Sequence, residues 1–214
     1  MHTFCSEVSA IDLAGKLITL EGLDFTGKST LARLLETRLC ESGHRVIVTR
    51  EPGGTRVGER VRDLLLAREH AEMLPLSELL LFMVSRAQHT HQVILPALRD
   101  GKTVLSSRYR LSSMAYQGYG RGLDLELIRR LNDAATEGRE ADLTLVIDLP
   151  VAVALRRRRG DGDRIEGEDT TFYERVRNGY LQLAAGDSRV RIIDGTPPVE
   201  RVCSDILADL DAVF

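Results

Sequence analysis

The feature that most constrains the fold of this chain is a short apolar run followed at once by a glycine-rich segment. LITLE, residues 17–21, has the length and composition of a buried strand, and GLDFTGKS, residues 22–29, fits the pattern G-x-x-x-x-G-K-[ST]. Leucines then recur at helical spacing as far as Leu39, and Gly43 closes that helix. A strand, a glycine-rich loop and a helix in this order predict a phosphate site at the helix N-terminus.

The residue types in this loop have chemical reasons. Gly22 and Gly27 let the backbone curl so that successive N–H groups face a bound anion. Lys28 can bring positive charge to the β- and γ-phosphates, and the Ser29 hydroxyl can ligate Mg²⁺. We therefore predict a nucleoside triphosphate site, with Lys28 also acting in catalysis and Ser29 as the metal ligand. The predicted ATP-binding loop residues are Gly22, Asp24, Phe25, Thr26, Gly27, Lys28, Ser29 and Thr30.

The rest of the chain alternates strand and helix. Further apolar runs at 46–48, 103–106, 143–148 and 191–194 predict four more strands, and apolar residues at helical spacing lie in the segments between them. One such helix runs from about Leu76 to about Leu98, whereas the segment after residue 106 is interpreted as a polar, cationic loop. The fold class is α/β, a five-stranded parallel sheet with helices on both faces. We expect residues 1–14 to be a flexible extension and residues 15–214 to be one domain.

Composition excludes several classes of protein. A formal net charge of −3 argues against a general nucleic-acid binder, so we expect no nucleic-acid partner. The apolar runs fall short of the roughly 18 to 20 residues of a membrane span, and the N-terminus lacks the pattern of a signal peptide. Three scattered cysteines, Cys5, Cys40 and Cys203, suggest free thiols in a reducing cytosol, and hence a cytoplasmic location.

Polar side chains at the strand ends suggest a second site. Arg50 ends the second strand and Arg108 ends the third, so the two arginines are placed to clamp a second phosphate near the loop. Phe82 and Arg86 lie four residues apart on one helix face, which suits a planar base. Taken alone, the pair can also be interpreted as a core residue, Phe82, and a surface cation, Arg86. RRRRGDGDRIEGED, residues 156–169, is similarly open to interpretation as a solvated charged face.

Five segments together resemble the bacterial thymidylate kinases, which make dTDP from dTMP and ATP. They are EGLDFTGKST, TREPGGT, LLLFMVSRAQH, SRYRLSSMAYQG and DRIE, and they appear in the order of that family from Gly15 onward. The resemblance implies a P-loop nucleoside monophosphate kinase fold with a short lid at about 156–169. It also implies Mg²⁺ with ATP as phosphoryl donor, a role in dTTP synthesis for DNA replication, and a homodimer to which the LLLFM helix contributes.

The resemblance assigns roles to individual residues. Phe82 would stack on thymine, Arg86 would bond a base carbonyl, and Ser113 and Gln117 would lie close to the base. Arg50 and Arg108 would hold the dTMP phosphate. Asp24 would face the deoxyribose 3′-hydroxyl, and Tyr116 would pack where a ribose 2′-hydroxyl would clash. Because the phosphate loop carries no arginine, the lid must supply the catalytic one. The candidates are Arg164 with Arg158 or Arg159, while Arg156 or Arg157 would lie over the adenine.

No general base is expected, because the acceptor is already an anionic phosphate oxygen. Catalysis would then be alignment and charge neutralisation.

The chain departs from the family at two positions. Ser107 stands where the family usually has an aspartate before the arginine, and Phe25 stands where a small residue is commoner. These departures keep two alternatives open: a nucleotide-binding protein of the same fold with little or no catalysis, and a kinase for another nucleoside monophosphate or a deoxynucleoside.

Overall fold

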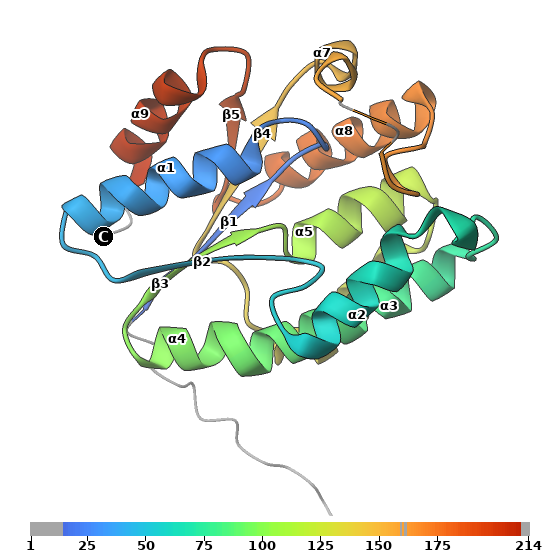
Figure 1. Ribbon diagram of the computed structural model, residues 1–214, viewed down its shortest axis with the longest axis horizontal. Helices are drawn as coiled ribbons and strands as arrows, with labels where there is room; N and C mark the ends of the chain where they lie inside the picture. Colours follow the sequence, from blue (N-terminus) through green and yellow to red (C-terminus); the bar gives the residue numbers. More distant parts are fainter. Residues whose placement is uncertain (1–14, 159, 161, 211–214) are drawn as a thin grey trace, which may run out of the picture.

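The computed structural model describes residues 15–158, 160 and 162–210. The extension predicted for residues 1–14 and the catalytic candidate Arg159 therefore lie outside the described residues. Five parallel strands form one sheet in the order β2-β3-β1-β4-β5, with helices on both faces, which confirms the predicted fold class (Figure 1). The strands are β1 Leu17–Glu21, β2 Val46–Arg50, β3 Thr103–Ser107, β4 Leu143–Asp148 and β5 Val190–Asp194.

The chain order of the strands places three functional segments at one edge of the sheet. β1 lies at the centre, and β3 and β2 follow it on one side. Ser107 pairs in register with Leu20 of β1 and with Arg50 of β2, so these strands end level with one another. The loops that follow β1, β2 and β3 therefore meet at the carboxyl edge, where ligands of open α/β sheets bind. The predicted adjacency of Arg50 and Arg108 at two strand ends follows from this register.

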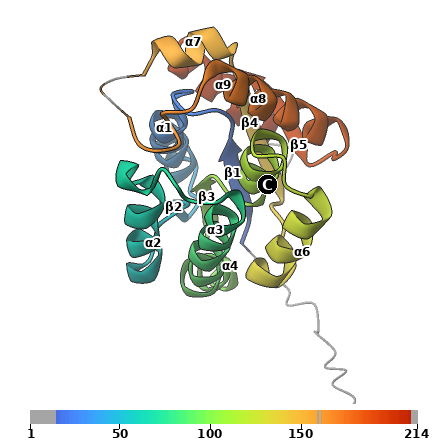
Figure 2. The same ribbon diagram turned by 90° about the vertical axis from the view of Figure 1, so that its right-hand side faces the viewer.

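Helices cover the two faces of the sheet unequally (Figures 1 and 2). One face packs against α1 and α9 through an aliphatic core that includes Leu20, Leu35, Leu145 and Ile206. The other face packs against α4, α7, α8 and the segment after β3, and α3 in turn contacts α2 and α6. The helices are α1 Lys28–Glu41, α2 Arg56–Leu66, η1 Arg68–His70, α3 Pro75–His89, η2 Thr90–Ile94, α4 Leu95–Arg99, α5 Arg110–Ser113, η3 Met114–Gly120, α6 Leu125–Thr136, α7 Val151–Arg156, α8 Thr170–Ala185 and α9 Val199–Leu210.

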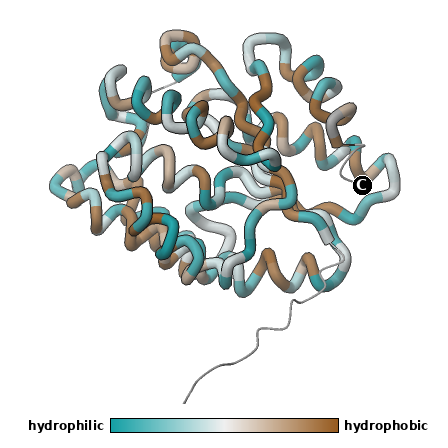
Figure 3. The backbone as a smooth tube through the Cα atoms, turned by 180° about the vertical axis from the view of Figure 1, so that it is seen from behind, coloured by the Kyte–Doolittle hydropathy of each residue, from teal (hydrophilic) through white to brown (hydrophobic). Residues whose placement is uncertain are grey.

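The helices alternate hydrophobic and hydrophilic residues along their length (Figure 3). This pattern is expected of helices that bury one side against a core. Within the described ranges, none of the helices is both long and apolar enough to cross a membrane. The long helix predicted from about Leu76 to Leu98 is confirmed as α3, η2 and α4 in succession, with a π-helical segment in its middle.

The prediction of a polar loop after β3 was wrong. Residues 110–120 form α5 and the π-helical η3, and most of their side chains are buried, including Ser113, Tyr116 and Gln117. Polar residues can lie in a buried helix when each finds a hydrogen-bond partner, as these three do. Helix α8 was not predicted. Its buried positions follow helical spacing but are mostly aromatic, so a pattern of aliphatic residues does not reveal them. They are Phe172, Tyr173, Val176 and Tyr180.

Candidate active site

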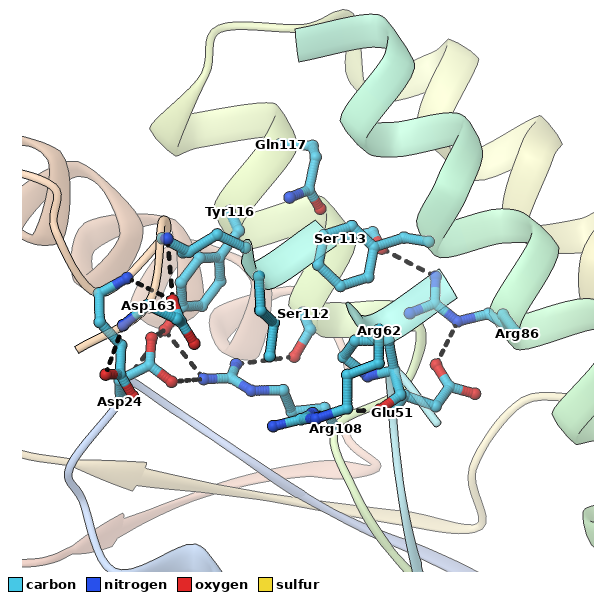
Figure 4. A pocket seen from close by; sticks show the side chains of 15 residues that line it. Asp24, Glu51, Arg62, Arg86, Arg108, Ser112, Ser113, Tyr116, Gln117 and Asp163 are labelled. Atoms are coloured by element: carbon cyan, nitrogen blue, oxygen red, sulfur yellow. Dashed lines mark hydrogen bonds and ion pairs between the residues drawn. The ribbon is translucent and has the colours of Figure 1, made fainter. Parts of the chain in front are cut away.

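A cavity opens at the carboxyl edge of the sheet between the loop after β1, the end of β2, α3 and the segment that follows β3 (Figure 4). We call it the acceptor cavity. It brings together all the predicted substrate-binding residues except Arg50. The lining residues are Asp24, Glu51, Pro52, Arg62, Leu66, Phe82, Arg86, Arg108, Ser112, Ser113, Tyr116, Gln117, Asp163, Ile165 and Glu166.

Arg108 lies at the bottom of this cavity, and its backbone has the unusual φ of 73°. Non-glycine residues seldom adopt this left-handed conformation unless the surroundings impose it. Here the Arg108 N–H donates to Leu20 O (2.9 Å), and the carbonyl accepts from the Ser106 hydroxyl (2.8 Å). The turn directs the guanidinium back over the phosphate loop, where Nη1 donates to the Ser112 hydroxyl (3.1 Å) and more weakly to Gly22 O (3.4 Å).

Asp24, Arg108 and Tyr116 form a compact polar triad. Arg108 Nη2 forms an ion pair with Asp24 and donates to the Tyr116 hydroxyl (3.1 Å), and that hydroxyl donates to the other oxygen of Asp24 (2.9 Å). The guanidinium carbon also lies 4.7 Å from the centre of the Tyr116 ring. Burial favours a higher pKa for Asp24, but the charges of Arg108 and Lys28 outweigh it, so the pKa is lowered. The triad therefore presents a fixed, ionised acid–arginine pair to the cavity.

A buried carboxylate supports this triad from below. Glu21, at the end of β1, accepts hydrogen bonds from the Ser112 and Tyr180 hydroxyls (2.5 and 2.9 Å) and from the Tyr109 N–H (2.8 Å). Burial raises its pKa. Because Ser112 also contacts Arg108, Glu21 acts on the arginine through a shared hydroxyl.

Arg86 is fully buried in the wall of the acceptor cavity, so its interpretation as a surface cation is wrong. Nε donates to Glu51 (2.7 Å), Nη1 to Ser113 and Asn132 (2.8 and 2.6 Å), and Nη2 to Tyr109 O (2.8 Å). A guanidinium has five N–H donors. Nη1 also donates weakly to Met83 Sδ (3.9 Å), whereas Nη2 has one partner, Tyr109 O, within the described part of the chain. The second N–H of Nη2 can therefore serve a carbonyl of a bound base. Phe82 lines the same cavity and is half-buried.

The phosphate loop encloses a second cavity beside the first. Lys28 and Ser29 line it together with Phe25, Arg50 and Ser107, and Asp24, Arg62, Arg108 and Glu166 line both cavities. Lys28 Nζ donates to Leu23 O (2.6 Å), Gly22 O (3.2 Å) and the Thr26 hydroxyl (3.3 Å). Burial and the charge of Arg108 lower its pKa to about 7. We call this space the phosphate cavity.

Phe25 in the phosphate loop has φ 66°, a left-handed value at which a small residue is less strained. The departure noted in the sequence therefore has a backbone cost.

A third cavity continues from the phosphate loop toward the loop that follows β5. Thr26, Gly27, Thr30 and Arg157 line it, together with residues from Gly195 to Val202. The adenine contact expected of Arg157 stays a prediction. Arg156 is exposed at the end of α7 and lines none of these cavities.

The other predicted arginines lie apart from the acceptor cavity. Arg50 is half-exposed, forms an ion pair with Glu59 (2.9 Å), and lines the phosphate cavity only. Arg164 forms an ion pair with the buried Glu78 (2.7 Å) and donates to Leu65 O (2.9 Å). It lines neither cavity. The charge of Arg158, by contrast, acts on Glu166, which lines both. The catalytic roles of these arginines stay predictions.

Sequence reasoning missed several residues that line the acceptor cavity. Glu51 and Pro52 lie inside TREPGGT, and Asp163 and Glu166 are the two ends of DRIE, but only the arginines of these motifs were considered. Arg62 on α2 had no motif of its own. The sequence could have indicated Arg62 through its position beside Val61 and three residues before Leu65, which places it on the margin of the buried face of that helix.

The five-stranded parallel sheet and the glycine-rich loop between β1 and α1 define the fold as that of a P-loop nucleoside monophosphate kinase. The family described as thymidylate kinase matches residues 20–206. Thymidylate kinases of Pelotomaculum thermopropionicum and Deinococcus radiodurans are 47% and 48% identical to it, over 94% and 91% of this chain and 95% of each relative.

A comparison with solved structures also finds a thymidylate kinase. The crystal structure of thymidylate kinase from Ehrlichia chaffeensis aligns with a TM-score of 0.77 and 33% identity, and covers 92% of this chain and 98% of that one. The chain belongs to the thymidylate kinase family, and its reaction is transfer of a phosphoryl group from ATP to dTMP.

Proposed function

We propose that the acceptor cavity binds dTMP with its base between Phe82 and Arg86 and its phosphate at Arg108. The observation that carries this proposal is the shared wall: Asp24 and Arg108 line both the acceptor and the phosphate cavity. A nucleotide whose base reaches Arg86 would bring its phosphate to Arg108, beside the γ-phosphate held by the P-loop. Ser113 and Gln117 supply polar groups near the base, and Tyr116 closes the sugar side.

The donor would lie with its phosphates over the P-loop and its adenine near Arg157. Mg²⁺ fits the oxygen donors in this space, since Ser29 lines the phosphate cavity with Ser107 and three carboxylates, Asp24, Glu51 and Glu166. When bound, the ion neutralises phosphate charge. Lys28, Arg108 and a lid arginine would hold and align the two phosphates, and the buried wall excludes water from the transferred group.

We also propose a homodimer formed through α3. Leu76, Leu80 and Val84 lie four residues apart on its outer face, and between 46% and 48% of each is exposed. Val57 and Leu64 on the adjoining α2 and Leu127 on α6 are exposed as well. An apolar stripe of this kind on a helix surface suggests a protein interface.

The free thiols of Cys40 and Cys203 fit a reducing compartment, and we therefore propose that the enzyme is located in the cytoplasm.

The base site is tested by kinetics of Phe82→Ala. Stacking of a base on an aromatic ring contributes roughly 1 to 3 kcal/mol, so the KM for dTMP is expected to rise about 5- to 150-fold while the KM for ATP is unchanged. Ser77→Ala, on an exposed position of the same helix, is the matched control. An unchanged KM for dTMP in folded Phe82→Ala would show that the base lies elsewhere.

A further inference from the structure

Glu78 is a fully buried carboxylate in the first turn of α3 that lines none of the three cavities, yet it contacts residues from two other parts of the acceptor wall. Oε1 accepts from Gln117 Nε2 (2.9 Å) and Arg121 Nε (3.2 Å). Oε2 accepts from Arg121 Nη2 (3.1 Å) and lies 2.7 Å from Arg164 Nη2. A buried carboxylate needs such partners, and removing one of them leaves a charge uncompensated.

The contacts continue beyond Glu78 to the end of the lid. Arg121 also forms an ion pair with Glu168 (2.5 Å), and its guanidinium carbon lies 4.6 Å from the centre of the Phe172 ring at the start of α8. Arg164, Glu78, Arg121 and Glu168 thus form a chain of three ion pairs between two carboxylates and two guanidiniums. It ties both ends of residues 164–168 to α3 and to Arg121, which follows η3.

The tied segment is part of the acceptor wall. Ile165 and Glu166 line the acceptor cavity, and both lie between the two tied residues, Arg164 and Glu168. Gln117, the third partner of Glu78, lines the same cavity from η3. One carboxylate therefore contacts both the residue proposed to lie beside the base and the lid segment that faces it.

We propose that Glu78 is a positioning residue for the acceptor site, which orients Gln117 toward the base and holds residues 164–168 as a fixed wall of the cavity. This rests on the proposed placement of dTMP. It gives Arg164 an anchoring role, distinct from the catalytic role first predicted for it. Asp and Gln do not replace Glu78 equally: Asp keeps the charge on a shorter side chain, whereas Gln keeps the length but offers an N–H₂ group to two guanidiniums.

The test compares Glu78→Gln, Arg164→Gln and the double variant in steady-state kinetics. Each single variant is expected to raise the KM for dTMP roughly 5- to 50-fold, with kcat and the KM for ATP close to those of the unaltered enzyme. The double variant should be no worse than the worse single variant, because both remove the same link. Glu78→Asp should recover part of the loss.

A second readout does not depend on activity. Amide hydrogen exchange of residues 164–169 should be faster in both single variants than in the unaltered protein. Arg177→Gln is the matched control, since it removes a two-bond ion pair with Asp148 (2.7 and 2.8 Å) from α8 outside the cavities. It should lower thermal stability without changing the KM for dTMP or this exchange.

Unchanged KM for dTMP, unchanged exchange, or additive effects in the double variant would each overturn the proposal. If Glu78→Gln does not fold, Arg164→Gln and Arg121→Gln carry the same test. Failure of the dTMP placement would look different: Gln117→Leu and Phe82→Ala would leave the KM for dTMP unchanged, while the exchange of residues 164–169 would still respond to Glu78→Gln.

Discussion

At the scale of single residues, Ser107 stands where the resemblance to thymidylate kinases leads us to expect a carboxylate. It lines the phosphate cavity at the end of β3, beside Arg108, where the family usually has an aspartate. A hydroxyl can accept a hydrogen bond there but brings no charge to a hydrated Mg²⁺. Asp24 and Glu166 line the same cavity, so negative charge is present without it.

Ser107→Asp is therefore expected to lower the Mg²⁺ concentration needed for half-maximal activity, by roughly 3- to 10-fold, because an added carboxylate attracts the hydrated ion. Ser107→Asn has the same shape without the charge and should behave like the unaltered enzyme. Mg²⁺ titrations of the initial rate measure both. Equal midpoints for the Asp and Asn variants would contradict an electrostatic role at this position.

The lowered pKa of Lys28 leads to a prediction about proton uptake when ATP binds. Burial and Arg108 lower its pKa from 10.5 to about 7, so the folded state binds fewer protons than the unfolded state between those values. The contribution of Lys28 to stability therefore rises with pH through that range. At pH 8 Lys28 is therefore largely neutral in the free enzyme. The negative phosphates of bound ATP would raise its pKa, so that the amine takes up a proton.

ATP binding at pH 8 should thus take up close to one proton. Calorimetric titrations in two buffers of different ionisation enthalpy measure this uptake. Lys28→Arg keeps its charge at every relevant pH and should abolish it. Proton uptake near zero in the unaltered enzyme would contradict the predicted state of Lys28.

Tyr116 leads to a prediction about sugar specificity. Its ring packs edge-on against Phe172 and Tyr180, and its hydroxyl is held by Asp24, so it cannot easily withdraw from the cavity. Tyr116→Ala should narrow the preference for deoxyribo- over ribonucleotides roughly tenfold, whereas Tyr116→Phe should keep that preference and mainly weaken dTMP binding. The ratio of kcat/KM for dTMP and its ribonucleotide counterpart measures this. An unchanged ratio in Tyr116→Ala would contradict the proposed contact.

At the scale of elements, helix α8, which was not predicted from the sequence, lines none of the three cavities but supports residues that do. Helix α8 supplies Tyr180 to Glu21 and Phe172 to Arg121. Its N-cap is Asp169, whose carboxylate accepts from the Phe172 N–H (2.7 Å). Asp169→Ala should cost about 0.5 to 2 kcal/mol and lower Tm by roughly 1 to 8 °C, as should Asp124→Ala at the equivalent cap of α6. Thermal unfolding measures both, and no loss in either would contradict the role of these caps.

The strands were predictable because each is a short aliphatic run bounded by polar residues, as in LITLE and LTLVID. The segment after β3 was not, because its buried polar groups are stabilised by partners distant in sequence. Arg86 illustrates the same limit. Its spacing from Phe82 was visible, but its enclosure by Glu51, Asn132 and Tyr109 depends on four segments meeting in three dimensions. The phosphate loop, by contrast, is local in sequence, and its geometry was predictable from eight residues.

At the scale of the whole molecule, the exposed apolar stripe on α3 predicts assembly. Leu80→Glu places a charge at its centre and should convert the homodimer to a monomer, because burying an unpaired carboxylate at an interface is costly. Ile192→Glu on β5, at the far edge of the sheet, is equally exposed and should leave the dimer intact. Sedimentation velocity distinguishes the two states. A monomeric unaltered protein, or a dimeric Leu80→Glu variant, would contradict the stripe as the interface.

We propose that one acceptor cavity, built by Arg108, Arg86 and Phe82 at the edge of the sheet, makes this chain a kinase selective for dTMP. Its most direct test is the rate of ADP release from ATP and Mg²⁺ with dTMP, dUMP, UMP, CMP, AMP and GMP offered separately. The predicted result is rapid turnover with dTMP and much slower turnover with the others, with serine at position 107. Faster turnover with another acceptor, or none with any acceptor in protein that still binds dTMP, would contradict it.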